Sequence, residues 1–284
     1  MKKIIFYLLA LSFTIITSCS DDKLGPSIFD TEPLPKNEFD EWLEDSIRSQ
    51  YNIRFNYRWE DIESDMEYNL IPADYNKSFE LAKLVKYLWL GAYDELTGNR
   101  DFLSIYVPKV IQLVGSPAVN KDTQTIVLGT AEGGLKITLY NVNALNLVNP
   151  DIEVLNEYYF KTMHHEFAHI LHQTKNYPVS YNEISAGNYS SGGWQNRSEL
   201  DAWKLGFVTN YASKEPQEDF VEVIANYVTN PKKWQEMMAN SATDVATINK
   251  KFEIVKEWLD SSWDIDIDQL RDIVSRRSAN IDNI

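Results

Sequence analysis

The chain has 284 residues, and 44% of them are hydrophobic, which is enough for one sizeable catalytic domain with a real core. Its formal net charge is −15, and the acidic residues are spread along the chain. Such a surface repels nucleic-acid phosphates and anionic membrane faces, so nucleic-acid binding is disfavoured. The aromatic share of 13% is explained most simply by packing.

The first 18 residues have the composition of a signal peptide. Lys2 and Lys3 give a basic start, and the apolar run at 4–16 is too short for a typical transmembrane helix. Cys19, the sole cysteine, follows directly, so no disulfide can form within the chain. This arrangement resembles the bacterial lipobox, in which signal cleavage leaves a lipid-modified cysteine at the N-terminus. The alternative is an ordinary signal peptide with an incidental cysteine. Removing residues 1–18 would leave 25 basic and 42 acidic residues, a net charge of −17.

Residues 19–37 are expected to form a flexible tether that begins at the acylated cysteine. The segment contains three prolines, a glycine and several acids, and it cannot bury enough apolar surface to fold alone. Its start, Ser20-Asp21-Asp22-Lys23, resembles the short acidic signal that sends lipoproteins of Bacteroides-type bacteria to the outer face of the outer membrane. The sequence therefore predicts a surface-exposed outer-membrane lipoprotein, held to the membrane by its lipid anchor.

The first half of the folded part is predicted to contain two helices and several strands. Apolar residues recur at helical spacing in 41–49 and in 79–95, and Asn76 or Ser78 can cap the second of these helices. Alternating patterns and runs of β-branched and aromatic residues predict strands at 51–59, 102–113, 123–128 and 135–142, with a turn at Gly133-Gly134. The last three strands are expected to form a small sheet.

The second half is predicted to be helical. A long helix at 151–173 is followed by a loop at 177–193. Further helices are expected at 198–211, 215–229, 231–239, 243–262 and 266–279. No internal repeat or change of composition divides residues 38–284. They are therefore expected to form one α+β domain, strand-rich first and helical afterwards.

An HExxH motif, formed by His165, Glu166 and His169, lies in the predicted long helix. Histidines at positions i and i+4 lie one turn apart on the same helix face, where both imidazoles can bind one zinc ion. Glu166 is placed to take a proton from water whose pKa the metal lowers to about 7. All four histidines of the chain lie between His164 and His172, which argues against coincidence. His172 is interpreted as a packing residue or as a neighbour of a ligand, and His164 as pointing away.

A catalytic zinc ion keeps three protein ligands and one open position, so a third ligand is needed, and no distant histidine exists to supply it. Glu218 and Glu222 lie at i and i+4 on a predicted helix. One of them can bind the metal while the other accepts a hydrogen bond from a ligand histidine and fixes its tautomer. Glu199 and Asp201 are alternative ligands, because the segment between the two motifs could fold back on the metal.

The signal peptide, the lipid cysteine, the segment HHEFAHILHQ at 164–173 and the segment EDFVE at 218–222 resemble a family of zinc metallopeptidase lipoproteins of Bacteroides-type bacteria. Members of that family accompany outer-membrane nutrient importers of the starch-utilisation type, and the resemblance covers most of the mature chain. More remotely, the order HExxH, Tyr, ExxxE is similar to the protease domain of anthrax lethal factor and to other zincins with a glutamate ligand.

These resemblances imply a zincin-like fold and a role for each matching residue. They imply that Glu218 is the third zinc ligand and that Glu222 is the carboxylate that supports a ligand histidine. They also imply that Tyr211, seven residues before Glu218, is the hydroxyl that steadies the oxyanion. An outer-membrane nutrient importer is the partner that the resemblance implies.

The sequence therefore predicts a peptidase that uses Zn²⁺ and acts on a peptide or protein. Glu166 is expected to activate water and then protonate the leaving amine, while Tyr211 stabilises the oxyanion. One alternative is a non-catalytic, substrate-binding surface lipoprotein with a vestigial zinc site, and the aromatic loop at 189–194 would suit ligand capture. An intact Glu166 argues against it, because a structural zinc ion has no use for a general base. A zinc hydrolase that cleaves another kind of bond is the remaining alternative.

Overall fold

The computed structural model describes residues 35–121, 126–127, 129–132, 134–146, 148 and 150–281. The expected signal peptide, Cys19 and nearly all of the tether lie outside these residues, as does most of the strand predicted at 123–128. Contacts group Glu38–Ile284 as one unit, separate from the residues before it. Within the described part of the chain, no helix combines the length and the apolar composition needed to cross a membrane.

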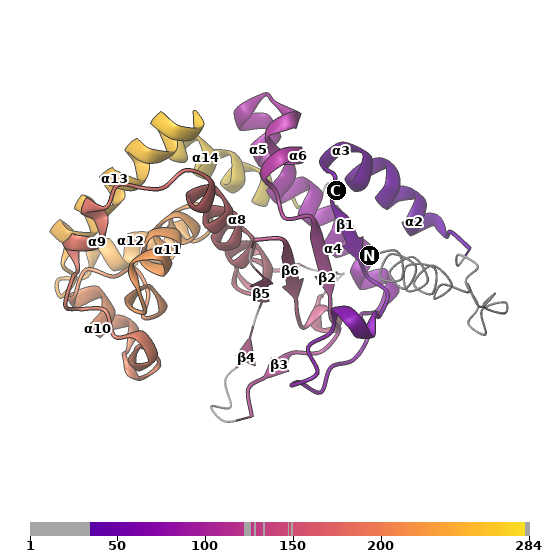
Figure 1. The fold of residues 1–284 in the computed structure, drawn as a ribbon, viewed down its shortest axis with the longest axis horizontal. Coiled ribbons are helices and arrows are strands. Elements are labelled where there is room, and N and C mark those ends of the chain that lie inside the picture. Colours follow the sequence, from indigo (N-terminus) through magenta and orange to yellow (C-terminus); the bar gives the residue numbers. More distant parts are fainter. Residues whose placement is uncertain are drawn as a thin grey trace, which may run out of the picture. The chain divides into compact units, whose positions relative to one another are not determined.

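A four-stranded sheet lies in the N-terminal part (Figure 1). Its strands follow the order β1 (Arg54–Asn56), β2 (Val110–Leu113), β6 (Lys136–Leu139) and β5 (Gly129–Glu132). The pairs β1–β2 and β2–β6 are parallel, whereas β5 runs antiparallel to β6. All four side chains of β6 are buried, as expected for a strand covered on both faces. A second, two-stranded sheet pairs β3 (Ala118–Val119) with β4 (Ile126–Val127).

Helices precede and interrupt this sheet. The first runs through α2 (Glu38–Leu43), the π-helical turn η1 (Glu44–Arg48) and α3 (Ser49–Tyr51). The second runs through α4 (Tyr75–Leu84), η3 (Val85–Leu90) and α5 (Gly91–Thr97). Both predicted helices are therefore present and longer than expected. The cap of the second is Asp74, whose side chain accepts a hydrogen bond from the Lys77 N–H, and not Asn76 or Ser78.

The strand predicted at 102–113 is wrong in its first half, because the chain forms helix α6 (Arg100–Tyr106) before it enters β2. The Asn99 side chain caps this helix by accepting a hydrogen bond from the Asp101 N–H. Phe102 and Leu103 are buried and Tyr106 packs against the core, and this spacing suits one face of a helix. An apolar run of this kind can form either a strand or a helix, and the Asn99 cap favours the helix here.

The C-terminal half is helical, as predicted. Its longest element runs through α7 (Ile152–Leu155), the π-helical turn η5 (Asn156–Phe160) and α8 (Lys161–Thr174). The other long helices are α11 (Pro216–Thr229), α12 (Pro231–Ala239), α13 (Val245–Trp263) and α14 (Ile267–Ser278). Every residue of α11 from Glu218 to Thr229 is buried, since this helix packs against α8, α12, α13 and α14.

Two details of the second half differ from the prediction. The segment at 177–193, expected to be a loop, contains the short helix α9 (Ser180–Ile184) and the start of the 3₁₀ turn η6 (Ser191–Asn196). The helix expected at 198–211 is reduced to α10 (Glu199–Lys204), with a separate 3₁₀ turn, η7 (Tyr211–Ser213). Gly206 stops α10 because it adopts the left-handed conformation, with φ of 75°.

The architecture is the α+β class that the sequence predicted, with a small, mostly parallel sheet first and a helical half after it. Helix α8 contacts α11 and strand β5 (Figure 1). It therefore forms the boundary between the sheet and the helical half.

Candidate metal centre

Two histidines of α8 and one glutamate of α11 converge where these helices pack together. The donor atoms of His165, His169 and Glu218 all lie within 4.8 Å of one another. Glu218 Oε2 is 3.1 Å from His165 Nε2 and 3.2 Å from His169 Nε2. Two imidazole nitrogens and one carboxylate oxygen are ligand types that zinc binds, so this group fits a zinc ion with an open position.

The local sequence explains why these side chains face one another. In α8, Met163, Phe167 and Leu171 are buried, and the Phe167 ring contacts the rings of Trp89 and Tyr93. The four-residue spacing of His165 and His169 places them on another side of the same helix, which faces α11. Packing of the apolar face therefore fixes the direction in which the histidines point.

Glu222 contacts His165 at Nδ1, the ring nitrogen that is not directed at Glu218. Its Oε1 lies 2.9 Å from His165 Nδ1, so the carboxylate fixes which imidazole nitrogen is free to bind a metal. Its Oε2 accepts hydrogen bonds from Thr209 Oγ1 at 2.6 Å and Asn226 Nδ2 at 3.1 Å, and lies 3.0 Å from Lys161 Nζ. Glu222 is only 2% exposed, and its four partners, His165, Thr209, Asn226 and Lys161, hold its side chain in one orientation.

The second oxygen of Glu218 is held by a cation. Lys214 Nζ donates to Glu218 Oε1 at 2.7 Å, which leaves Oε2 directed at the two histidines. Tyr211 lies beside this pair: its ring centroid is 5.8 Å from that of His165 and 4.9 Å from that of Trp194. Burial and the Glu218 carboxylate raise the pKa of Tyr211, so its hydroxyl stays protonated and able to donate.

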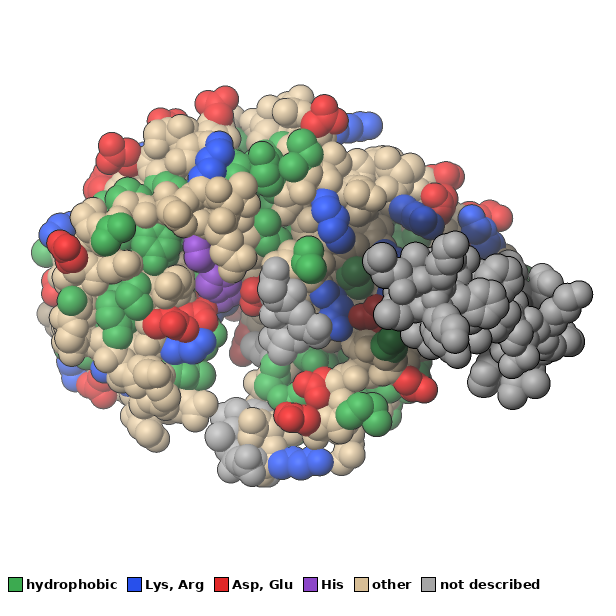
Figure 2. Space-filling view, viewed as in Figure 1, with side chains coloured by type: hydrophobic (Ala, Val, Ile, Leu, Met, Phe, Trp, Pro, Cys, Tyr) green, Lys and Arg blue, Asp and Glu red, His purple; other side chains and the backbone are tan. Residues whose placement is uncertain are grey.

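Glu166 follows His165 and lines a cleft of about 1210 Å³ that borders the metal centre. Burial raises the pKa of its carboxyl group, despite the opposing effect of the nearby histidines. His165, Tyr211 and Glu222 also line this cleft. Figure 2 shows histidine side chains reaching the surface where this face of the molecule is hollowed. A proton acceptor, Glu166, and a hydroxyl donor, Tyr211, therefore share one solvent-accessible space with the candidate ligand His165.

The charges of the centre depend on one another. Burial alone would lower the pKa of His165, but hydrogen bonds with Glu218 and Glu222 raise it to about 9. Burial would raise the pKa of Glu218, but hydrogen bonds from His165, His169 and Lys214 lower it well below its usual range. The pKa of Glu222 is lowered likewise, with Lys161 as the largest stabilising influence. Both carboxylates are therefore ionised at neutral pH.

The remaining histidines lie where the sequence analysis expected them. His172 Nε2 is 2.9 Å from His169 Nδ1, so His172 neighbours a candidate ligand. Burial lowers its pKa to about 4, and that of His164 to about 3. His164 Nδ1 instead contacts the Tyr93 hydroxyl at 3.0 Å, away from the centre. Both side chains are therefore neutral at physiological pH.

The alternative ligands Glu199 and Asp201 do not join the metal centre. Asp201 is exposed and pairs with Lys204, whereas Glu199 lines the cleft and pairs with Lys233. Lys161 and Lys214 were not singled out from the sequence. Each precedes a candidate ligand by four residues, and that helical spacing could have identified them. Thr209 lies in a segment between helices and carried no such signal.

A buried ion pair is formed by Asp219, the residue that follows the candidate ligand Glu218. Lys251 Nζ of α13 is 2.6 Å from Asp219 Oδ2, and both side chains are fully buried. Lys251 also donates to the Gly206 carbonyl oxygen at 2.7 Å, and Tyr189 donates to Asp219 at 2.9 Å. Burial raises the pKa of Asp219 to about 6 against the influence of Lys251. This pair ties α11 to α13 and to the segment after α10.

The fold and the centre define an α+β protein whose helices present a His-His-Glu group able to hold a metal ion. The chain belongs to the family described as "Putative zinc-binding metallo-peptidase", whose model matches residues 32–268. A crystal structure of a "putative zinc-binding metallo-peptidase" from Bacteroides caccae ATCC 43185 is 49% identical to it. That match has a TM-score of 0.76 and covers 91% of this chain and 98% of the other. No curated protein matches the chain.

Proposed function

We propose that this protein is a zinc-dependent peptidase that hydrolyses peptide bonds. The observation that carries the proposal is the convergence of His165 Nε2, His169 Nε2 and Glu218 Oε2, with His165 and the neighbouring Glu166 both lining one cleft. Membership of a family described as metallo-peptidases supports the choice of substrate class. The three converging side chains would hold the zinc ion, and Glu222 would keep His165 in the tautomer that binds it.

Two residues of the cleft, Glu166 and Tyr211, would act on the substrate beside the zinc ion. Zinc bound there would supply a Lewis acid that polarises a carbonyl group and lowers the pKa of water. Glu166 takes the proton from the attacking water and returns it to the leaving amine, and its raised pKa suits both transfers. Tyr211 donates its hydroxyl proton in a hydrogen bond to the oxyanion that forms on the former carbonyl.

The substitution Glu166→Gln tests the proposal. It should leave zinc content at about one ion per chain and abolish cleavage of a peptide library, because the amide cannot accept the proton. The exposed Glu253→Gln, on α13, is the matched control and should keep both properties. Full activity of Glu166→Gln would refute the assigned role. Zinc binding and peptide binding without hydrolysis by the wild type would favour a binding lipoprotein instead.

We further propose that the protein acts at the outer face of the outer membrane and serves a nutrient importer. This proposal rests on the lipobox-like sequence around Cys19 and on the resemblance noted above. Mass spectrometry of the mature N-terminus and protease treatment of intact cells would test it. We expect an acylated Cys19 and loss of the protein on treatment. A Cys19→Ser variant that still fractionates with membranes would contradict the anchor.

A further inference from the structure

The cleft beside the metal centre extends well beyond it. One wall is the continuous helix α7–η5–α8, whose residues line the cleft from Ile152 to Glu166. Fourteen residue steps along a helix span about 20 Å. The volume of about 1210 Å³ is larger than the roughly 300–1,000 Å³ usual for small-ligand pockets. The cleft therefore has the length of a groove for a chain molecule.

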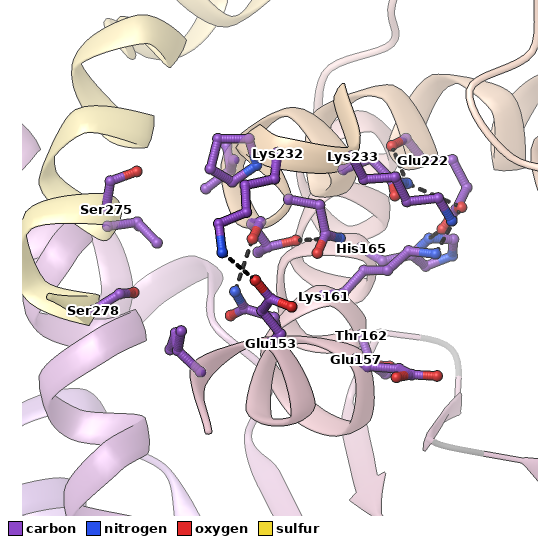
Figure 3. Close-up of a pocket in the computed structure, with 18 of the residues that line it drawn as sticks. Glu153, Glu157, Lys161, Thr162, His165, Glu222, Lys232, Lys233, Ser275 and Ser278 are labelled. Carbon is purple, nitrogen blue, oxygen red and sulfur yellow. Dashed lines mark hydrogen bonds and ion pairs between the residues drawn. The ribbon is translucent and has the colours of Figure 1, made fainter. Parts of the chain in front are cut away.

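The opposite walls come from the helical half of the protein. They include Trp203 of α10, Lys233 of α12, and Ser275 and Ser278 of α14. Figure 3 shows Ser275 and Ser278 at one side, the pair Glu153–Lys232 between, and His165 with Glu222 at the other side. The far end of the cleft is thus built by α14, a helix that contributes no residue to the metal centre.

The charged side chains on the walls of the cleft include an excess of acidic ones. Six glutamates and three lysines line it, which gives a net charge of −3 when all are ionised. All three lysines are neutralised by glutamates of the wall, since Lys161 pairs with Glu222, Lys232 with Glu153 and Lys233 with Glu199. A ligand with neutral or basic side chains matches this lining better than an acidic one.

We infer that this cleft binds an extended segment of the substrate, about six neutral or basic residues long, on one side of the scissile bond. The length follows because an extended chain rises about 3.3 Å per residue and the cleft is about 20 Å long. The inference rests on the proposed peptidase function and names the shape and charge of its substrate. The α14 end of the cleft would hold the residues of the substrate that lie farthest from the bond.

A peptide series tests the length. Cleavable peptides lengthened one residue at a time, at either end, should show kcat/KM rising at one end only and levelling off after about six residues. At a fixed position in the added segment, Lys should be preferred to Glu. Equal values at all lengths, or a preference for Glu, would overturn the inference while leaving the peptidase proposal intact.

The substitutions Ser275→Trp and Ser278→Trp test the location, and they should not disturb the core because Ser275 is exposed and Ser278 half-buried. Each should reduce kcat/KM for long peptides on the order of tenfold, equivalent to about 1.4 kcal/mol, and leave short peptides unaffected. Ser261→Trp, exposed on α13 outside the cleft, is the control. Uniform effects on short and long peptides, or none on either, would refute the location.

Binding separates this inference from the proposed function. Zinc-loaded Glu166→Gln protein can be titrated with the same peptides by fluorescence anisotropy. If long peptides bind more tightly than short ones, and if Ser275→Trp weakens this binding, the peptide-binding role of the cleft is supported. This holds even if no peptide is hydrolysed, in which case only the peptidase proposal would be refuted. If no peptide of any length bound or was cleaved, both would be refuted.

Discussion

Replacing Glu222 by Gln should weaken zinc binding without removing a zinc ligand. The side chain keeps its size, and its amide oxygen can still accept the hydrogen bond from His165 Nδ1, which is 2.9 Å long in the native centre. The negative charge that makes His165 a stronger ligand is lost, however. The amide nitrogen would also face the donors Lys161, Thr209 and Asn226, which now surround Oε2.

Loss of such an outer partner typically lowers metal affinity 10- to 100-fold, which is about 1.4 to 2.7 kcal/mol. We expect a change of this size in a competition titration with a chelator of known zinc affinity. Glu236→Gln is the control, because Glu236 lines the same cleft but contacts none of the metal-binding residues. A zinc affinity within twofold of the wild type, in a folded Glu222→Gln protein, would refute this account of Glu222.

Three further outcomes follow from the same geometry. Glu218→Ala should abolish tight zinc binding as measured by elemental analysis, and one retained zinc per chain would show that Glu218 is not the third ligand. Lys251→Met should lower the free energy of unfolding by about 3–5 kcal/mol in urea titrations, because it leaves Asp219 buried without its cation. The double variant Lys251→Met with Asp219→Asn should recover part of this loss. If the free-energy changes of the two single variants were additive in the double variant, the two side chains would not be coupled. The pKa of His165 is raised from 6.5 to about 9, so its contribution to the stability of the metal-free protein is complete below pH 6.5 and is lost as the pH rises through about 9. Zinc must displace this proton, so calorimetry at pH 7 in buffers of different ionisation enthalpy should detect about one proton released per zinc ion, and no release would contradict the assigned protonation.

Periodicity identified the elements that carry the centre because both are long amphipathic or buried helices. The four-residue spacings of His165 with His169, and of Glu218 with Glu222, could be read directly as shared helix faces. Which glutamate approaches the histidines could not be read in this way. That choice depends on how α11 is rotated against α8, and this rotation is fixed by packing along the whole buried length of α11.

Short elements were harder to predict, since local hydrogen bonds decide them. The Asn99 cap converts part of an apolar run into α6, and the left-handed Gly206 ends α10 several residues early. Because α10 ends early, Thr209 and Tyr211 lie outside that helix, where they approach Glu222 and His165. The surroundings of the metal centre therefore depend on the left-handed conformation of Gly206, which cannot be predicted from hydrophobic periodicity.

The π-helical turn η5 lets the helix that forms one wall of the cleft gain or lose a residue without changing the direction of its flanking parts. A π-helical turn contains an extra residue, so deleting one residue from Asn156–Phe160 would restore an uninterrupted α-helix. Because the wider turn advances by less than the 100° per residue of an α-helix, the extra residue is absorbed locally, and the helix upstream of it keeps nearly the same orientation after the deletion. Glu153 would still face the cleft after such a deletion, and α8 and the metal centre would keep their positions. The effect of a single insertion or deletion at this site would thus be confined to the side chains of the turn itself, of which Asn156 and Glu157 line the cleft, while the chemistry of the centre was inherited unchanged.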